Sequence, residues 1–414
     1  MSGTGRTIYI AGAGIAGLTL ALALGKFGAT VVVLERHKAV QEVGAGLQIS
    51  PNARKALNQL GLDRALREVS FAPEGIDVMP FRASRPLTTL RLGDEMLRRY
   101  GAPYVVMHRA DLVEVLYRAA KRFANIDILF GVRAYDVVSH ARGISVTVDE
   151  ADGKSRTARA HAFIGADGIN SHTRTGILQG EKATYSGHVA WRTTLPIEAL
   201  QGVVASDRTT LLMGPGYHAV CYPLPYRGRI NVALFAKEKQ AAAFGATAKA
   251  PTLPWAMLPS RQFSALLKAA EGSWGYWIMS TVLAERWHEG GIGLIGDAAH
   301  AMLPFQAQGA VMAIEDAAIL APLLMTEPTA EAALARYEAL RRPRVERVVK
   351  LSRSNGFAFH LEWPFTIARD RVIASQGALG HLQRLDWLYS YDPAPEPLLA
   401  APPRQVGQDF TNEP

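Results

Sequence analysis

Short apolar runs alternate with amphipathic stretches along most of this 414-residue chain. The first run, TIYIAG, is almost entirely apolar, as expected of a strand that is buried in a parallel sheet. Residues 15–27 have the pattern of a helix that Gly28 ends, and TVVVLER then predicts a second strand. This order of elements predicts one βαβ unit over residues 7–35.

Further segments have the hydrophobic spacing of a helix, about 3.6 residues, or the composition of a strand. Residues 51–69 and 108–123 have the apolar spacing of amphipathic helices, while IDILFGV, GISVTVDE and AHAFIGADG predict strands. Residues 185–280 are rich in β-branched and aromatic residues between glycines and prolines, which predicts an antiparallel sheet. The run GIGLIGDAAH predicts another buried strand, and residues 309–325 and 329–353 predict helices.

The predicted fold class is therefore α/β: a Rossmann-like nucleotide-binding domain, an inserted and mostly antiparallel β-sheet domain, and C-terminal helices. The predicted boundaries are 1–70, 106–177 and 286–345 for the discontinuous nucleotide-binding domain, 71–105 and 178–285 for the inserted domain, 346–391 for a C-terminal helical region, and 392–414 for an extended or disordered tail.

Composition changes this picture in three respects. Cys221 is the one cysteine, which excludes a disulfide framework and a Cys-rich metal site, and we predict no metal. The net charge of +8 favours anionic ligands, but lysine and arginine are too dispersed to predict nucleic-acid binding. No apolar run approaches the roughly 18 residues of a spanning helix. We therefore expect a cytoplasmic protein without stable membrane association.

The glycines after the first strand predict a dinucleotide site. Gly12 allows the tight turn, Gly14 lets a pyrophosphate approach the backbone, and Gly17 lets the helix pack closely on the strand. Glu35 ends the second strand, where a carboxylate can accept both ribose hydroxyls of an adenosine. The alternative is a tight turn that serves packing alone, with Glu35 as a solvated charge.

A Gly-Asp pair much later in the chain, Gly296-Asp297, decides between NAD and FAD. Asp297 follows a buried strand and needs a hydrogen-bonding partner there. The ribityl chain of FAD offers hydroxyls, and NAD has no such chain. A helix beginning near Gly309 would point its free N–H groups at the flavin ring. We therefore predict FAD; the alternative is that Asp297 is an ordinary helix cap.

Three motifs, in this order, resemble those of a known family: the glycine turn described above, an Asp-Gly pair after a buried strand in GADGINSHTR, and the Gly-Asp pair with the segment that follows it. Their residues outside the first motif are Asp167, Gly168, Arg174, Gly296, Asp297, Pro304 and Gly309. Over residues 6–345 the chain resembles the FAD-dependent group A aromatic hydroxylases, flavoprotein monooxygenases of the para-hydroxybenzoate hydroxylase fold. EVGAGLQISPNA and LDWLYSYD resemble the salicylate, 3-hydroxybenzoate and 6-hydroxynicotinate hydroxylases.

This resemblance implies an FAD site with particular residues. Glu35 would hold the adenosine ribose with Arg36 beside it, and Arg109 would contact the ribityl-pyrophosphate portion. The other implied contacts are Val132 at the adenine, Asp167 at the FAD and the nicotinamide donor, and Asp297, Gly309 and Ala310 at the ribityl chain and the ring. Pro304, which continues the Gly-Asp motif, is also an implied cofactor-binding residue. For Arg174, an exposed helix charge and a functional role are equally compatible with the pattern.

The resemblance also implies the chemistry. NADH or NADPH reduces FAD, O₂ forms a flavin C4a-hydroperoxide, and its distal oxygen hydroxylates a small phenolic or N-heterocyclic ring, with or without a carboxylate. A base that removes the phenolic proton would help. By resemblance His218 and Tyr222 line the pocket; the alternatives are a satisfied strand histidine and a core tyrosine. Gln48 stands where some relatives carry histidine, so it can hydrogen-bond but cannot act as a base.

Other interpretations remain open at this point. Arg192 is compatible with pairing to a substrate carboxylate or with a solvated strand charge, and His300 is better explained as structural. Another flavoenzyme on this scaffold, such as a halogenase or a prenyl-chain reductase, is one alternative function, and a flavin-bearing regulatory or binding protein is another. The protein would be a monomer or a homodimer.

Overall fold

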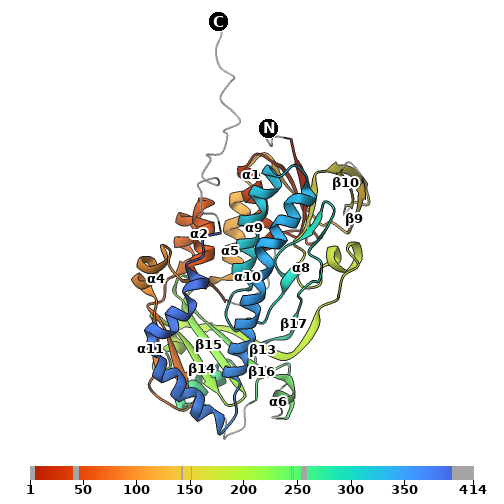
Figure 1. Ribbon diagram of the computed structural model, residues 1–414. Helices are drawn as coiled ribbons and strands as arrows, with labels where there is room; N and C mark the ends of the chain where they lie inside the picture. Colours follow the sequence, from red (N-terminus) through yellow and green to blue (C-terminus); the bar gives the residue numbers. More distant parts are fainter. Residues whose placement is uncertain are drawn as a thin grey trace.

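The computed structural model describes residues 5–40, 46–140, 143–150, 152–243, 245, 247–252 and 259–393. Most of the predicted tail, residues 394–414, and residues 42–45 of the EVGAGLQISPNA segment lie outside the described residues. The α/β class is confirmed, with a nucleotide-binding part at one end and a large sheet at the other (Figure 1).

Within the described residues, a six-stranded sheet with the order β18-β19-β12-β1-β2-β8 forms the first part. The strands from β19 to β8 pair in parallel, and β18 pairs antiparallel with β19. The carboxyl ends of β1, β12 and β19, where the three motifs lie, therefore meet at one edge. The strands are β1 (Thr7–Ala11), β2 (Thr30–Glu35), β8 (Ile126–Phe130), β12 (Ala162–Gly165), β18 (His288–Glu289) and β19 (Ile292–Leu294).

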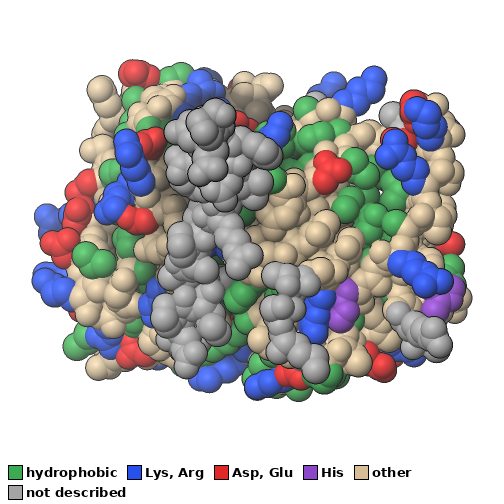
Figure 2. All heavy atoms as spheres, turned by 90° about the horizontal axis from the view of Figure 1, so that it is seen from above, with side chains coloured by type: hydrophobic (Ala, Val, Ile, Leu, Met, Phe, Trp, Pro, Cys, Tyr) green, Lys and Arg blue, Asp and Glu red, His purple; other side chains and the backbone are tan. Residues whose placement is uncertain are grey.

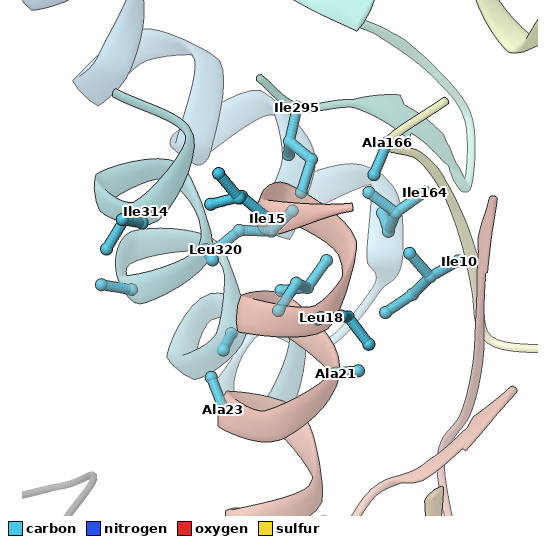
Figure 3. Close-up of a cluster of buried hydrophobic side chains, with 14 of the residues drawn as sticks. Ile10, Ile15, Leu18, Ala21, Ala23, Ile164, Ala166, Ile295, Ile314 and Leu320 are labelled. Carbon is cyan, nitrogen blue, oxygen red and sulfur yellow. The ribbon is translucent and has the colours of Figure 1, made fainter. Parts of the chain in front are cut away.

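Helices pack on this sheet through an apolar core. Helix α1 (Ile15–Lys26) lies between the sheet and α9 (Gly309–Thr326), so that Leu18 of α1 lies near Ile10 and Ile164 of the strands (Figure 3). By length and composition α9 is apolar enough to cross a membrane, but 72% of it is buried in this fold. Helix α5 (Arg109–Ala120) also packs against α1.

A seven-stranded sheet, again counted over the described residues, has the order β17-β13-β16-β15-β14-β5-β6. All its pairs are antiparallel except β14 with β5. Alternate side chains therefore share a face, which places Arg192, His218 and Phe235 together and Trp191 and Tyr217 on the other face. Its strands are β5 (Gly75–Pro80), β6 (Thr88–Arg91), β13 (Thr184–Pro196), β14 (Arg208–Gly214), β15 (Tyr217–Leu224), β16 (Arg229–Lys237) and β17 (Gly275–Thr281).

Two long helices join the parts. Helix α10 (Ala330–Phe359) runs from the nucleotide-binding part down to the seven-stranded sheet, and α11 (Phe365–Tyr389) lies beside β6 (Figure 1). Gly377 breaks α11 with a φ of 61°, a value that glycine adopts readily. The C-terminal helical region thus contributes side chains to both parts.

The remaining β-strands and α-helices are short. They are β3 (Gly46–Ile49), β4 (Ser70–Phe71) and β7 (Val105–His108) in one small sheet, β9 (Ala134–His140), β10 (Gly143–Asp149) and β11 (Ser155–Ala160) in another, and the helices α2 (Pro51–Gln59), α3 (Asp63–Glu68), α4 (Gly93–Tyr100), α6 (Glu238–Ala243), α7 (Arg261–Ala269) and α8 (Asp297–His300).

A buried charged cluster holds α9, α10 and the Gly-Asp loop together. Arg341 of α10 donates to Glu315 (2.6 Å) and Asp316 (2.8 Å) of α9, and all three side chains are 0% exposed. Asp316 also accepts from His300 Nε2 at 2.6 Å, and Arg344 donates to Glu315. His300 therefore has a structural role, as predicted. The cationic neighbours lower the pKa of Asp316 to about 2 in spite of its burial.

Charge on the surface is mixed. On the face seen from above, lysine and arginine side chains lie among aspartates and glutamates rather than in one stripe (Figure 2). A basic stripe is the usual electrostatic signature of a nucleic-acid site.

Candidate functional site

The glycine loop after β1 is packed so tightly that side chains cannot replace its hydrogens. Gly12 has a φ of 102°, and a Cβ there would lie 2.5 Å from the Ala166 carbonyl oxygen. A Cβ on Gly17 would lie 1.9 Å from the Gly12 carbonyl oxygen. Gly17 thus permits the close contact of helix and strand, which leaves the N-terminus of α1 open at the edge of the sheet.

Glu35 ends β2 beside this loop. Its Oε2 accepts from the backbone N–H of Ala13 at 3.0 Å, and its Oε1 accepts from the His37 N–H at 2.9 Å. The His37 ring nitrogen Nδ1 lies 2.6 Å from the same Oε1. Glu35 is therefore held in one position at the end of the strand, and it is not the solvated charge of the alternative interpretation.

Asp167 follows β12 at the same edge. Its Oδ2 accepts hydrogen bonds from the Tyr135 hydroxyl (2.7 Å) and from the Thr173 N–H (3.0 Å). Its Oδ1 is buried and makes no hydrogen bond within the described part of the chain. A buried carboxylate oxygen without a donor is costly, so this atom indicates a ligand that donates a hydrogen bond.

The Gly-Asp loop after β19 approaches from the other side. Gly296 has a φ of 59°, and a Cβ there would press on Ala16 and Ala313, so the loop lies directly against α1 and α9. Asp297 starts α8, for which Gly296 is the N-cap, so Asp297 itself is not the cap residue. A Cβ on Gly309 would meet only Asp297 Oδ1, at 4.0 Å. The N-terminus of α9 is therefore open toward Asp297.

These features surround a first cavity of about 660 Å³. It brings together ten of the twelve predicted cofactor residues, which come from seven separate segments: Gly12, Gly14, Glu35, Arg36, Arg109, Val132, Asp167, Asp297, Gly309 and Ala310. The other two lie elsewhere. Gly17 packs the helix on the strand, and Pro304 lies on the wall of a second cavity.

The second cavity, of about 920 Å³, lies between the seven-stranded sheet and the C-terminal helices. Its wall is largely apolar and includes Val220, Phe305 and Leu385. Gln48 also lines it and accepts a hydrogen bond from the Tyr104 hydroxyl at 2.5 Å. The segment 304–310 separates the two cavities, because Pro304–Ala307 line the second and Gly309–Ala310 line the first.

His218 lines the second cavity and is only 1% exposed. Its Nδ1 lies 2.9 Å from Nε2 of His360, which caps the C-terminal end of α10. Burial holds the pKa of His218 well below its ordinary value, and the neighbouring His360 and His188 lower it further. At neutral pH the ring of His218 is therefore neutral.

Tyr222 shares the sheet face with His218, as the spacing of four predicts, but its surroundings differ. A Cβ on Gly46 would lie 2.4 Å from the Tyr222 hydroxyl oxygen, so this side chain packs against the backbone of β3. Burial raises the pKa of the hydroxyl, and Arg192 lowers it in part. Tyr222 is thus a neutral hydroxyl beside Arg192 and Gly46.

For two arginines, Arg192 and Arg174, the sequence left a solvent-exposed charge and a functional role both open. Arg192 lies on the inner sheet face, 5.7 Å from the ring centres of both Phe235 and Trp277, so it is not a solvated strand charge. Arg174 is 1% exposed and donates to the Ala298 carbonyl at 2.7 Å, and further bonds hold it to the loop around it. Of the two interpretations left open for Arg174, the exposed helix charge is therefore excluded.

Sequence reasoning missed His360, Tyr104, Tyr135 and His37. Tyr104 and Tyr135 precede or begin strands, where an aromatic residue is ordinary, and their partners are distant in sequence. His37 offered the clearest signal, since it lies two residues after Glu35 at the end of a strand. His360 offered no signal in the sequence, because only the folding of a 30-residue helix brings it to His218.

A glycine-rich turn, two open helix N-termini and an unsatisfied carboxylate oxygen around one cavity are the features of a dinucleotide-binding protein. The model of the FAD binding domain family matches residues 6–352, and the chain belongs to this family. His360 lies beyond the matched residues.

Relatives and solved structures agree with this. The chain is 33% identical over 400 residues to 3-amino-4-hydroxybenzoate 2-monooxygenase of Streptomyces platensis, covering 94% of this chain and 96% of that protein. It is 29% identical to 3-hydroxybenzoate 6-hydroxylase 1 of Aquipseudomonas alcaligenes, covering 92% and 97%. The fold is that of Klebsiella pneumoniae HpxO complexed with FAD and uric acid (TM-score 0.79, 23% identity, covering 94% and 97%) and of a salicylate hydroxylase substrate complex (0.74, 23%, covering 97% and 99%).

The protein is accordingly an FAD-dependent aromatic monooxygenase, and the halogenase, reductase and regulator alternatives are not favoured. The residues of the first cavity fit FAD, since Asp167 Oδ1 lacks a donor and the space beside Gly309 is open. When bound, FAD takes electrons from NAD(P)H and activates O₂ for transfer of one oxygen atom to a ring.

Proposed function

We propose that this enzyme hydroxylates a small aromatic ring that carries an anionic group, and that the ring is held in the second cavity with His218 as the base. The observation that carries the proposal is the shared segment 304–310, which lies between the two cavities. A flavin in the first cavity would reach this segment with its ring, and an aromatic substrate would lie on the other side.

The proposed contacts of FAD follow from the wall of the first cavity. Glu35 and Arg36 would hold the adenosine ribose end, Val132 the adenine, and Arg109 the ribityl-pyrophosphate portion. Asp297 would accept hydrogen bonds from the ribityl chain, and the open N-terminus of α9 would face the pyrimidine edge of the ring. Asp167 Oδ1 would accept from the cofactor.

Around the substrate, this chain's own side chains would bind and orient the ring and accept one proton. The apolar wall would exclude water, and Gln48, itself held by Tyr104, would hydrogen-bond a polar substituent. His218 would take the phenolic proton, because a phenolate ring is more electron-rich. The Tyr222 hydroxyl, which lies against Gly46 of β3, would be a further hydrogen-bonding group on the same face of the sheet as His218.

An anionic group on the ring is supported by the charges at this cavity. Among its described lining residues the side chains that carry full charge are Arg347, Lys350, Arg369 and Arg384, which are all basic. A cavity lined by one sign of charge attracts ligands of the opposite sign. Both relatives reported above are named for hydroxybenzoates, which are carboxylates.

A substrate screen tests the proposal. Purified protein with bound FAD is incubated with NADH or NADPH and a panel of hydroxybenzoates, pyridine carboxylates and hydroxyquinolines, and NAD(P)H oxidation, O₂ uptake and ring products are measured. We expect a carboxylated ring to stimulate NAD(P)H oxidation and to gain one hydroxyl group. The proposal would be contradicted if no aromatic acid stimulated NAD(P)H oxidation by protein that carries its flavin.

Replacing Lys350 by methionine tests the anionic group. We expect KM for the best carboxylated ring to rise by about threefold with kcat unchanged, because an exposed charge is worth roughly 0.2–1 kcal/mol and acts equally on ground and transition states. The corresponding carboxamide should show no change. Lys268→Met, an exposed lysine on α7, is the matched control and should leave both compounds unaffected. An equal rise for acid and amide would refute the role of the charge.

We also propose that the enzyme works in the cytoplasm, where NAD(P)H is available, as a monomer or a homodimer. Size-exclusion chromatography with light scattering distinguishes the two assemblies.

A further inference from the structure

His218 and His360 form a direct contact that joins the second cavity to the end of α10. Nδ1 of His218 lies 2.9 Å from Nε2 of His360, within hydrogen-bond distance, and the two residues are 1% and 3% exposed. One nitrogen of the pair must carry a hydrogen and the other must not. The contact therefore fixes which nitrogen of His218 is left for the cavity.

Among the described residues, the rings of three phenylalanines pack on His218, and the ionisable groups that act on the pair are basic. Phe235 stacks on His218 with ring centres 4.8 Å apart, and Phe305 and Phe359 pack at 5.1 Å. The ionisable groups that act on the pair are His188, which stacks on His360, and Lys237 and Arg369. Burial and these basic neighbours lower the pKa of His360 to about 3, so both rings are neutral at neutral pH.

The hydrogen in this contact is assigned from the proposed role of His218. A neutral imidazole carries one hydrogen, so His218 can accept a proton at Nε2 only when its own hydrogen is on Nδ1. Nδ1 of His218 faces Nε2 of His360, and Nε2 of His360 must then be the acceptor. The hydrogen of His360 is left on Nδ1, which is buried and has no hydrogen-bond partner within the described part of the chain.

We propose that His360 is a positioning residue for the hydroxylation step: it accepts a hydrogen bond from Nδ1–H of His218 and so leaves Nε2 of His218 unprotonated, ready to accept the hydroxyl proton of the ring substrate. The O–H bond of the substrate breaks and an N–H bond forms at Nε2. The resulting imidazolium keeps its Nδ1–H donated to His360. This inference rests on the proposed function, in which His218 is the base.

Two substitutions of His360 separate positioning from packing. His360→Gln keeps an acceptor oxygen near the position of Nε2, whereas His360→Phe fills the space among the phenylalanines without an acceptor. His188→Phe is the matched control, because His188 stacks on His360 but has no hydrogen bond to His218. Thermal melting and FAD content establish that each variant is folded.

The first readout is the tautomer of His218, which needs no turnover. Two-bond ¹H–¹⁵N correlation spectra of the FAD-loaded protein, with His218 assigned by its loss in His218→Gln, should show hydrogen on Nδ1 and none on Nε2. The His360→Gln and His188→Phe variants should keep this pattern, and His360→Phe should lose it. A wild-type His218 protonated at Nε2, or a pattern unchanged in His360→Phe, would overturn the inference.

The second readout is kinetic, with the ring acid that gives the largest stimulation in the screen. We expect kcat to fall about tenfold in His360→Phe with KM nearly unchanged, and His360→Gln to recover most of the loss; His218→Gln should fall about 100-fold, in the range of general-base catalysis. Full activity of His218→Gln would refute His218 as the base while leaving the tautomer result standing. A large loss in His218→Gln with none in His360→Phe would refute the positioning role alone.

Discussion

Replacing Asp297 by alanine is expected to weaken FAD binding by about 10- to 100-fold, because each hydrogen bond to a charged acceptor contributes roughly 1.5–3 kcal/mol. Asp297 starts α8 directly beside the open N-terminus of α9, where a Cβ on Gly309 would meet only its Oδ1, at 4.0 Å. The variant should therefore emerge from desalting largely colourless. The ratio of flavin to protein absorbance and an FAD titration measure the effect.

Asp297→Asn is the matched control for this change. It keeps one carbonyl oxygen as an acceptor at the same place and should retain more flavin than the alanine variant. The charged cluster behind the loop is unaltered in both variants, so melting of the apoproteins should be alike. Wild-type affinity for FAD in Asp297→Ala would contradict the assignment of this residue.

Replacing Arg341 by methionine is expected to cost about 3–5 kcal/mol of folding free energy, because it leaves buried carboxylates without their partner. Glu315 and Asp316 are both 0% exposed and both accept from Arg341. Asp316 would retain His300, and Glu315 would retain Arg344. The midpoint of urea unfolding of the FAD-free protein measures the loss.

Arg336→Met provides the comparison, since it lies on the same helix and its ion pair with Glu327 is largely exposed on the arginine side. That substitution should cost less than about 1 kcal/mol. Acid should have a related effect: the lowered pKa of Asp316 means that its stabilisation is present above its ordinary value near 3.8 and is lost as the pH falls toward 2. Equal unfolding midpoints for the two arginine variants would refute the account of the cluster.

The nucleotide-binding part was predictable because its signals are local. A strand, a glycine turn, a helix and a strand-end carboxylate follow one another within residues 7–35, and each has its own physical reason in the sequence. Asp297 was predictable for a similar reason, since a carboxylate after an apolar strand needs a partner. The carboxyl ends of parallel strands then bring these segments to one edge.

The second cavity was predictable only in part. His218 and Tyr222 follow from the period of a strand, but the sequence cannot tell that Tyr222 packs on Gly46 while His218 lines the cavity. His360 meets His218 across 142 residues through tertiary packing alone. Arg174 has the local pattern of an exposed helix charge, and only the loop that folds around it makes it buried.

The most direct test of the central claim is a crystal structure of the protein purified with its flavin. One FAD should lie extended in the first cavity, with the adenosine ribose at Glu35, the ribityl chain at Asp297, and the flavin ring against the segment 304–310. Density that places the ribityl chain away from Asp297, or the flavin ring remote from the second cavity, would contradict it.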